Sequence, residues 1–564
     1  MKYVELAKAY ERLENTPSKL EKAAILADSF KKCSDQDLPY MVLLSGGRVF
    51  PDYDQTELGV AQQLVIKAIS KAAGESESRV EKKFKSTGDL GLVVELFASN
   101  KKQKTLGQKS LTIEKVFKNI QGMTKHAGKG SRDRKLNLIA ELLSAASPLE
   151  AKYIIRTVLQ QLRIGIAEGI IRDAVAKAFD VSAESVENAW NMKSDFGEIA
   201  LAAKKGGTPG LKKIRLELGK SVQVLLAEKA PDLKTALESF DNPAIEVKVD
   251  GMRAQMHKKG NDVWIYTRRL ENVTAQFPDL VKLVRKYVTA NECIIEGEVM
   301  GINPKTREPL AFQILSQRIH RKYDIEKTLR EIPVQANLFD IIYLDGKTLF
   351  DKNLGERRKI LERVITQTKE FKLIEQIVTK DLERAQRFYD HALRMKQEGV
   401  MVKNLDAPYI PGRSVGGGWL KVKPTMESLD LAIVGATWGT GKRAGALTSF
   451  MLACRDADTD AFLECGMMST GIKEKKESEI DVTYEDMTKL LKPLITSEKS
   501  GEAKITPKVV IEVAYEEIQK SPTYSSGFAL RFPRFLRLRP EKGVEQADTM
   551  DRVSYLYESQ KMRK

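Results

Sequence analysis

The sequence predicts a multidomain chain in which an all-α region, an α+β region and an all-β region follow one another. Residues 1–215 carry apolar side chains at helical spacing and little strand-like alternation. Residues 216–424 mix alternating strand patterns with helices, and residues 425–564 contain mostly short strands separated by turn residues. The run from Gly206 to Gly210, with Pro209 inside it, predicts a linker near the first boundary. A length of 564 residues suits three or four domains of about 150 residues each.

Composition restricts the class of protein. The chain has 93 lysines and arginines against 77 acidic residues, so its net charge of +16 suits a polyanionic partner, although many basic proteins have none. No run approaches the roughly 20 apolar residues of a membrane span, and the N-terminus does not resemble a signal peptide. The four cysteines are scattered and form no Cys-x-x-Cys pair, which argues against a disulfide framework or a zinc site. We therefore expect a cytoplasmic enzyme without a membrane partner.

Two basic stretches in the helical region are suited to phosphate. Ser131 is predicted to cap a helix N-terminus, where Arg132 lies next to a natural anion site. A second basic patch surrounds Arg163 and Gly165, where one helix is predicted to end before the next begins. An ordinary capped helix with a solvated face explains the first stretch equally well.

The stretch from Glu246 to Arg253 is the most informative in the α+β region. Alternation places Glu246, Lys248 and Asp250 on one strand face, with apolar residues on the other, and Asp250-Gly251 then predicts a turn. A lysine that faces a pocket is a potential amine nucleophile once its pKa is lowered. A half-buried strand that ends in an Asp-Gly hairpin turn accounts for the same residues equally well.

Carboxylates recur on later strands of this region. Period-2 alternation places Glu296 and Glu298 on one face, where paired carboxylates suit a hard cation or a ribose hydroxyl. Glu398 begins another predicted strand.

An aromatic residue and two lysines complete the pattern of the α+β region. Phe339 lies in a mostly apolar run and suits either the core or the stacking of a base. Lys421 and Lys423 share one strand face after the glycine-rich run 411–418 and would bind phosphate if they faced a pocket.

The all-β region predicts a small closed barrel of the OB-fold type. Strand patterns at 429–434, 450–454 and 509–513 alternate with glycine-rich turns. Near the end, four arginines occur within the nine residues 531–539, interleaved with aromatic residues. Arginines in this pattern favour a phosphate or nucleic-acid surface.

Taken in order, these stretches resemble the sequence motifs of the ATP-dependent DNA ligases, most closely the archaeal and eukaryotic replicative type. The motif-like stretches are residues 246–253, 267–274, 296–298, 312–318, 398–403, 419–423 and 531–542. The helical region resembles the DNA-binding domain of this family, and residues 439–443 and 521–527 resemble parts of its OB-fold domain. The resemblance covers nearly the whole chain.

The resemblance implies three domains: an all-α DNA-binding domain (1–215), an α+β adenylation or nucleotidyltransferase domain (216–424) and an all-β OB-fold domain (425–564). It implies that the protein seals nicks in duplex DNA with ATP and Mg²⁺, through a lysyl-AMP intermediate, in replication, repair and recombination. We expect a monomer in the archaeal cytoplasm, associated with the nucleoid and acting on nicked duplex DNA.

The resemblance also implies roles for single residues. Lys248 would carry AMP, and Glu298 and Glu398 would hold the metal ion. The nucleotide and its phosphates would contact Glu246, Arg253, Arg268, Glu298, Phe339, Arg413, Lys421, Lys423, Arg534, Arg539 and Lys542. The DNA would contact Ser131, Arg132, Arg163 and Gly165.

The sequence departs from the family pattern at two places. Glu541 stands before Lys542 where relatives more often have aspartate, but a carboxylate is kept, so we expect activity. The segment that begins at Gln108 resembles the start of an archaeal sliding-clamp contact but lacks its paired aromatic residues, so a plain basic loop explains it better.

Three other classes of protein share some of these features. An RNA ligase or RNA-capping nucleotidyltransferase would use the same lysine chemistry, but the long helical region argues against it. An NAD-dependent ligase is disfavoured because the four-cysteine zinc site is missing. A DNA-binding protein without catalytic activity would need a broken motif, whereas Lys248, Glu298, Glu398 and Lys421 are all present.

Overall fold

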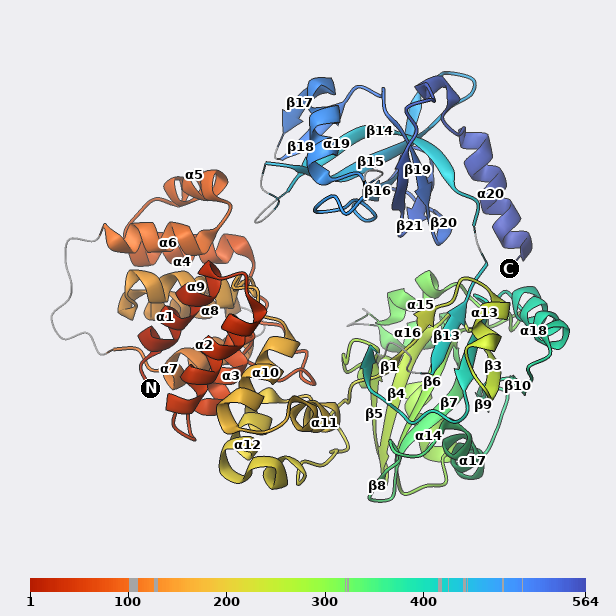
Figure 1. Cartoon of the computed structure of the whole chain (residues 1–564), viewed down its shortest axis with the longest axis horizontal. Coiled ribbons are helices and arrows are strands. Elements are labelled where there is room, and N and C mark those ends of the chain that lie inside the picture. The colour runs from red at the N-terminus through yellow and green to blue at the C-terminus, as the bar shows by residue number, and fades with distance from the viewer. Residues whose placement is uncertain are drawn as a thin grey trace. The chain divides into compact units, whose positions relative to one another are not determined.

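The structure is a computed structural model (Figure 1). It describes residues 1–100, 110–125, 130–319, 321, 324–413, 418–424, 426–439, 443, 445–478, 481–499 and 501–563. Backbone contacts divide the chain into two compact units, which we describe separately. The first comprises Met1–Glu228, Asp250–Glu375 and Lys403–Trp419, and the second comprises Lys229–Val249, Gln376–Val402 and Leu420–Lys564. No helix in the described ranges is long and apolar enough to cross a membrane.

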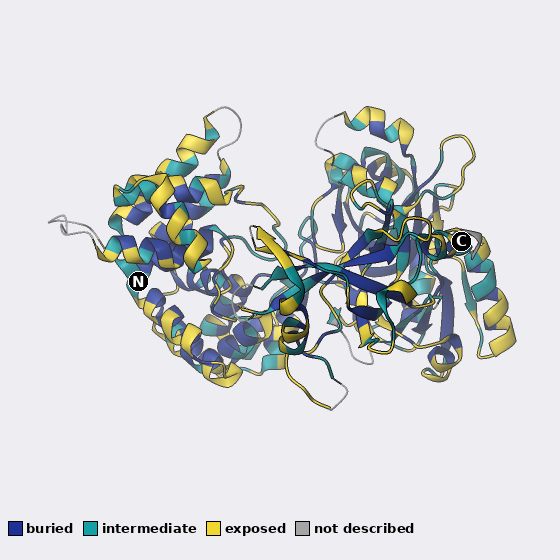
Figure 2. Cartoon of the chain, turned by 90° about the horizontal axis from the view of Figure 1, so that it is seen from above, coloured by how far each residue is buried: buried dark blue, intermediate teal, exposed yellow. Residues whose placement is uncertain are grey.

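The N-terminal part of the first unit is helical, as predicted. Its helices are α1 (Tyr3–Asn15), α2 (Lys19–Lys32), α3 (Leu38–Ser45), α4 (Gln62–Ala73), α5 (Glu77–Thr87), α6 (Leu90–Ser99), α7 (Ile113–Gly122), α8 (Ser131–Ala145), α9 (Pro148–Val158), α10 (Glu168–Phe179), α11 (Ala183–Lys193) and α12 (Phe196–Leu211). One apolar core, which extends from Tyr3 to Leu211, joins them. Most of these helices bury one side in this core and expose the other (Figure 2), whereas α9 is buried over nearly its whole length.

Local signals explain several helix boundaries. Ser147 and Glu150 form a capping box at the start of α9, in which each side chain accepts a hydrogen bond from the other residue's backbone N–H. The prediction that Ser131 caps α8 is wrong: Gly130 is the cap, with φ 80°, and Ser131 is the first helical residue without a capping hydrogen bond. Glycine adopts this left-handed conformation without strain.

The predicted linker is present only as a kink. The run from Gly206 to Gly210 lies within α12, which is broken only at Gly207, where φ is 54° and ψ is −145°. Two helical segments therefore meet at a kink at Gly207, and the second segment ends at Leu211.

A six-stranded sheet forms the second part of the first unit. Its strand order is β5-β4-β6-β7-β8, and β9 pairs with β7. The strands are β4 (Met252–Lys259), β5 (Asp262–Thr267), β6 (Glu292–Gly301), β7 (Val334–Leu344), β8 (Lys347–Thr348) and β9 (Phe371–Leu373), and β1 (Leu225–Leu226) pairs separately with β12 (Gly412–Arg413). The associated helices are α14 (Pro278–Tyr287), α15 (Phe312–Ile319), α16 (Ile325–Glu331) and α17 (Leu354–Val364).

The two faces of this sheet differ in polarity. One face joins residues such as Ala254, Val299 and Leu338 to apolar residues of α14 and α17 in a single core. Because side chains alternate along a strand, Arg253, Glu298 and their neighbours at period 2 lie on the opposite face. This second face is called the polar face below.

A five-stranded sheet has the order β10-β3-β11-β13-β2. Its strands are β2 (Glu228–Lys229), β3 (Pro243–Val247), β10 (Gln376–Val378), β11 (Val400–Asn404) and β13 (Trp419–Val422), accompanied by α13 (Leu233–Glu238) and α18 (Leu382–Arg394). Strand β3 is buried throughout. The turn at Asp250-Gly251 is present, but it is not a hairpin turn, because β3 and β4 belong to different sheets.

The C-terminal part of the second unit is mostly β-structure, as predicted. Its strands are β14 (Leu429–Trp438), β15 (Leu447–Arg455), β16 (Phe462–Met468), β17 (Ile495–Lys499), β18 (Glu502–Ile505), β19 (Val510–Ala514), β20 (Glu517–Lys520), β21 (Phe528–Arg531) and β22 (Arg534–Leu538). Helices α19 (Tyr484–Leu491) and α20 (Met550–Arg563) contribute to the same apolar core. This region is called the barrel below.

Candidate active site

Lys248 directly follows the last residue of β3 and is fixed through its backbone. Its N–H donates to the carbonyl of Gly399 at 2.8 Å, and its own carbonyl accepts from the N–H of Glu398 at 3.0 Å. Gly399 has φ 130°, and a Cβ at this position would lie 2.3 Å from the carbonyl oxygen of Val422. The glycine therefore allows the backbone of β13 to approach the segment that faces the lysine.

Glu398 connects the two lysines of this site. Its Oε2 lies 2.5 Å from Lys248 Nζ and 2.8 Å from Lys423 Nζ. Lys423 also lies 3.3 Å from Glu516. Burial alone would raise the pKa of the Glu398 carboxyl, but the two ammonium groups hold that pKa well below its usual range. Burial likewise opposes the charge on Lys423, yet Glu398 raises the pKa of Lys423 above its ordinary value. Glu398 and Lys423 therefore both remain ionised at neutral pH.

Glu246 lies on β3 with its side chain completely buried, rather than on a solvated face. Its Oε1 accepts a hydrogen bond of 2.8 Å from Gln376 Nε2, and the two residues are direct partners across the β3–β10 pair. A buried carboxylate of this kind suits the recognition of a flat polar group such as a nucleobase.

On the polar face of the six-stranded sheet, Glu296 is the centre of a buried network. Its carboxylate accepts from Arg253 at 2.8 Å, from Tyr409 Oη at 3.0 Å and from Gln255 Nε2 at 3.3 Å. Burial and the adjacent Glu296 raise the pKa of Tyr409 well above its ordinary value, so its hydroxyl stays a donor. Arg253 Nε is buried without a hydrogen-bond partner in the described structure, which leaves this donor for a ligand.

The same network extends to His257. The N–H of Gly219 donates to His257 Nδ1 at 3.2 Å, so the other ring nitrogen carries the proton and donates to Gln255 Oε1 at 3.0 Å. Burial lowers the pKa of His257 to about 3, which keeps the ring neutral and fixes this direction. His257 thus orients Gln255, which in turn supports Glu296.

Phe339 is 6% exposed and lies between cations and a second aromatic ring. It meets Trp419 edge to face at a centroid distance of 5.7 Å. The charged groups of Arg253 and Lys403 lie 5.3 and 4.4 Å from its ring centroid. The structure is therefore compatible with both predicted roles of Phe339, a core residue and a ring that stacks on a base, because the ring is packed but lies on the polar face.

The remaining predicted nucleotide residues differ in their surroundings. Glu298 is half-buried and pairs across the sheet with Arg253 on one side and Asn337 on the other. Lys421 is half-buried on β13, and Arg268 is exposed just after β5. The side chain of Arg413 and the segment at Gln108 lie outside the described residues.

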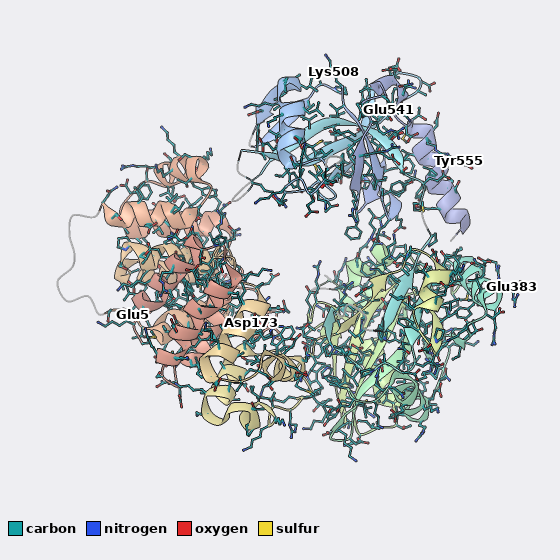
Figure 3. All side chains as sticks on the ribbon, in the orientation of Figure 1. Glu5, Asp173, Glu383, Lys508, Glu541 and Tyr555 are labelled. Carbon is teal, nitrogen blue, oxygen red and sulfur yellow. The ribbon has the colours of Figure 1, made fainter. Side chains whose placement is uncertain are left out.

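Most cationic residues of the last motif form ion pairs within the barrel. Arg539 donates to Asp430 at 2.8 and 2.9 Å, and Lys542 lies 2.5 Å from the same carboxylate. Glu541, labelled in Figure 3, accepts from Arg539 Nε at 2.6 Å. Arg534 is exposed. Arg539 and Lys542 would have to leave Asp430 to bind a nucleotide.

The predicted DNA contacts lie at the start of α8 and in the loop between α9 and α10. Arg132 is exposed in the first turn of α8. Arg163, with φ 59°, donates to the carbonyl of Gly88 at 3.2 Å. Gly165 has φ 66°, and a Cβ there would lie 2.6 Å from Lys22 Nζ.

Sequence reasoning missed several members of the site: Gln255, Lys403, Tyr409 and Glu516. Lys403 had a local signal, since it lies on the predicted strand that Glu398 begins, whereas Gln255 lies on β4, which was not predicted. Tyr409 and Glu516 had none, because only the fold brings them to Glu296 and Lys423.

Comparison with known proteins identifies the family. Residues 2–176 match the DNA ligase N terminus, residues 224–423 the ATP dependent DNA ligase domain, and residues 443–542 the ATP dependent DNA ligase C terminal region. The DNA ligase of Nanoarchaeum equitans is 48% identical over 100% of this chain and 99% of its own. The DNA ligase of Thermococcus fumicolans is 46% identical over 99% of this chain and 98% of its own. Among solved structures, Pmar-Lig_PreS3 covers 95% of this chain and 99% of its own with a TM-score of 0.58, and at 18% identity it supports the fold alone.

Proteins of this family seal nicks in duplex DNA through an adenylate intermediate and take the adenylate from ATP. The chain belongs to the ATP-dependent DNA ligases.

Proposed function

We propose that Lys248 is the residue that carries AMP during sealing. The single observation that supports this role is the placement of Lys248 at the end of a buried strand, with Nζ 2.5 Å from an ionised glutamate. An amine paired as an ammonium has no lone pair for attack, so the described arrangement is the resting form.

In the first step, deprotonated Lys248 Nζ attacks the α-phosphorus of ATP, and the bond to the bridging oxygen breaks to release pyrophosphate. In the second step, a 5′-phosphate oxygen of the nick attacks the same phosphorus and restores the free lysine. In the third step, the 3′-hydroxyl loses its proton, attacks the 5′-phosphorus and expels AMP. Each step is an in-line displacement, so the side chains act by positioning and charge neutralisation.

The other roles follow the chemistry of each side chain. Glu246 would accept hydrogen bonds from the adenine, and Phe339 would stack on it. The phosphates would be held by Arg253, Arg268, Arg413, Lys421, Lys423, Arg534, Arg539 and Lys542.

The carboxylates present are compatible with Mg²⁺. No group of three metal-binding side chains occurs in the part of the chain that the structure describes. Mg²⁺ commonly uses one or two carboxylates and completes its shell with substrate phosphates and water. Glu398 Oε2 is the first candidate ligand, although it is the atom that Lys248 and Lys423 contact, so the ion would have to displace at least one of them. Glu298 is the second candidate. When bound, Mg²⁺ would neutralise charge on the phosphate oxygens.

The nicked duplex would contact the helical region through Ser131, Arg132, Arg163 and Gly165. Lysines, arginines and backbone N–H groups bind phosphate without reading sequence.

We place the functional domains at 1–215, 216–424 and 425–564. We also expect a monomer in the archaeal cytoplasm, and gel filtration with light scattering tests the oligomeric state. Sliding-clamp binding through the segment at Gln108 is tested by co-elution with the clamp before and after this segment is deleted.

The direct test uses α-labelled ATP with the wild type and Lys248→Ala. The wild type should acquire a label that maps to Lys248, passes to a nicked duplex and disappears as the strand is sealed. Lys248→Ala should acquire no label but bind the duplex within about twofold of the wild type. Sealing by this variant contradicts the proposal, and a label that moves only to an RNA 5′ end favours an RNA ligase.

A further inference from the structure

A basic pocket lies at one edge of the six-stranded sheet, outside the residues assigned above. Its volume is about 580 Å³, and its lining residues are Arg307, Gln335, Gln367, Thr368, Lys369 and Lys372. None of these six lining residues is acidic, although Glu370 pairs with Arg307 at 2.6 Å. Among the described residues, no carboxylate lies within ion-pair distance of Lys369 or Lys372, and both lysines are exposed.

The neutral residues of the pocket present hydrogen-bond donors. Thr368 Oγ1 accepts from the N–H of Phe371 at 3.1 Å, and Gln367 Oε1 accepts from the N–H of Leu373 at 3.0 Å. Because these acceptors are used within the protein, the hydroxyl proton of Thr368 and the amide protons of Gln367 remain for a ligand. Two ammonium groups together with such donors suit a phosphate group.

Strand register connects this pocket with the polar face. Lys372 pairs with Asn337 across β9 and β7, Asn337 with Glu298 across β7 and β6, and Glu298 with Arg253 across β6 and β4. Residues directly opposite each other on neighbouring strands share a face. Lys372 therefore ends a row of four side chains on the polar face.

We propose that the pocket of Lys369, Lys372 and Arg307 binds a backbone phosphate of the nicked DNA, near the nick. The proposal rests on the proposed function, because it takes the polar face as the side on which ATP and the nick react. Strands are about 4.8 Å apart, so β9 lies roughly 10 Å from the strand of Glu298. At a rise of about 3.4 Å per nucleotide, this distance corresponds to a phosphate about three nucleotides from the nick.

The first experiment compares two double variants that remove the same charge. Lys369→Gln with Lys372→Gln alters the pocket. Lys282→Gln with Lys359→Gln removes two exposed lysines from α14 and α17, the helices that contribute to the apolar core on the opposite face. Affinity for a nicked duplex is measured from about 0.05 to 0.3 M salt, and the rate of lysyl-AMP formation is measured without DNA.

The pocket variant should bind the duplex about tenfold more weakly near 0.1 M salt, and its log–log salt slope should fall by about two. The control variant should stay within about twofold, and both should form lysyl-AMP at the wild-type rate. Lys369→Arg with Lys372→Arg keeps the charge and should restore binding. Equal losses in pocket and control variants overturn the proposal, as does a failure of the arginine variant to restore binding. A raised KM for ATP with unchanged DNA affinity also overturns it and assigns the pocket to nucleotide phosphates.

A second experiment locates the phosphate. Single methylphosphonates, which lack the negative charge, are placed along both sides of the nick. One or two positions, about three nucleotides away, should weaken binding by the wild type but not by the pocket variant. Uniform effects on both proteins overturn the proposal. If the wild type forms no lysyl-AMP, the proposed function fails, while the DNA-binding comparison still tests the pocket.

Discussion

Removal of one hydroxyl group, by Tyr409→Phe, tests whether the buried network around Glu296 supports the site. Tyr409 is 2% exposed, and its ring stacks on Phe350 at a centroid distance of 5.2 Å. Phenylalanine keeps these contacts and the volume. The change removes the hydrogen bond to Glu296 and leaves the buried N–H of Leu225, which now donates to Tyr409 Oη at 3.1 Å, without an acceptor.

The magnitude follows from these two losses. A hydrogen bond to a charged group contributes about 1.5–3 kcal/mol, and an unsatisfied buried donor costs about 1–3 kcal/mol. We expect a loss of about 3 kcal/mol, which corresponds to a fall of about 6–12 °C in the unfolding midpoint of a region of this size. Lysyl-AMP formation should slow by about tenfold, because Glu296 then holds Arg253 less firmly.

The matched control is Tyr343→Phe, which removes a hydroxyl that donates to the half-exposed Glu292 at 3.1 Å. Because Glu292 is open to solvent and water can replace the lost donor, this change should cost less than about 1 kcal/mol and leave the rate of lysyl-AMP formation unchanged. The pKa of Tyr409 lies above its unfolded value of about 10, so its stabilising contribution is complete below pH 10 and is lost as pH rises further. The difference between wild type and Tyr409→Phe should therefore shrink above pH 10. Equal stability of the two phenylalanine variants at neutral pH refutes the reasoning.

Two further substitutions test other parts of the chain. Gly251→Ala places a Cβ 2.5 Å from the carbonyl oxygen of Val299, and the resulting shift of the turn after Lys248 should slow lysyl-AMP formation by about 100-fold. Gly169→Ala, whose Cβ would have no atom within 4 Å, is the control. If the two variants form lysyl-AMP at rates within threefold of each other, this expectation is contradicted. Glu14→Gln should destabilise the helical region by about 1–2 kcal/mol at pH 7, because Arg156 and Lys152 outweigh burial and lower the pKa of Glu14 to about 2. Since this value lies below the unfolded one, the stabilisation is present above about pH 4.3 and is lost as pH falls toward 2, so unfolding curves of wild type and variant should converge in acid.

The strands, and the faces on which their charged residues lie, could be predicted well from the sequence. Glu296 and Glu298 lie on one face of β6, because period-2 alternation is a direct consequence of strand geometry. The strands predicted at 429–434, 450–454 and 509–513 correspond to β14, β15 and β19. Errors occurred where several local solutions compete, as at Ser131, where the preceding glycine takes the cap position.

Partners across long sequence separations could not be predicted. The Asp250-Gly251 turn was correctly placed, but only pairing with distant strands shows that it connects two sheets instead of closing a hairpin. Tyr409 reaches Glu296 across 113 residues, and no local pattern marks such a contact. The sequence thus indicates which side chains are candidates for catalysis and binding, whereas the hydrogen-bond network that orients them depends on the fold.

Charge balance at the site leads to a prediction about the metal ion. Lys248 and Lys423 are balanced by Glu398 and Glu516, and Arg253 is balanced by Glu296. These cations are therefore already compensated, and the triphosphate of ATP would meet the carboxylates as well as the ammonium groups. A divalent cation that neutralises a carboxylate and the phosphates together removes this repulsion.

We expect ATP to bind at least about tenfold more weakly after Mg²⁺ is removed with EDTA, as measured by calorimetry with protein freed of AMP. Glu398→Gln removes one of these carboxylates and should reduce the dependence of ATP affinity on Mg²⁺, even though lysyl-AMP formation is impaired. Glu383→Gln, on the exposed side of α18, is the control and should retain the full dependence. Equal ATP affinity of the wild type with and without Mg²⁺ would mean that the carboxylates do not oppose the triphosphate. In that case Lys248, Lys423 and Arg253 would have to break their ion pairs with the carboxylates before ATP binds.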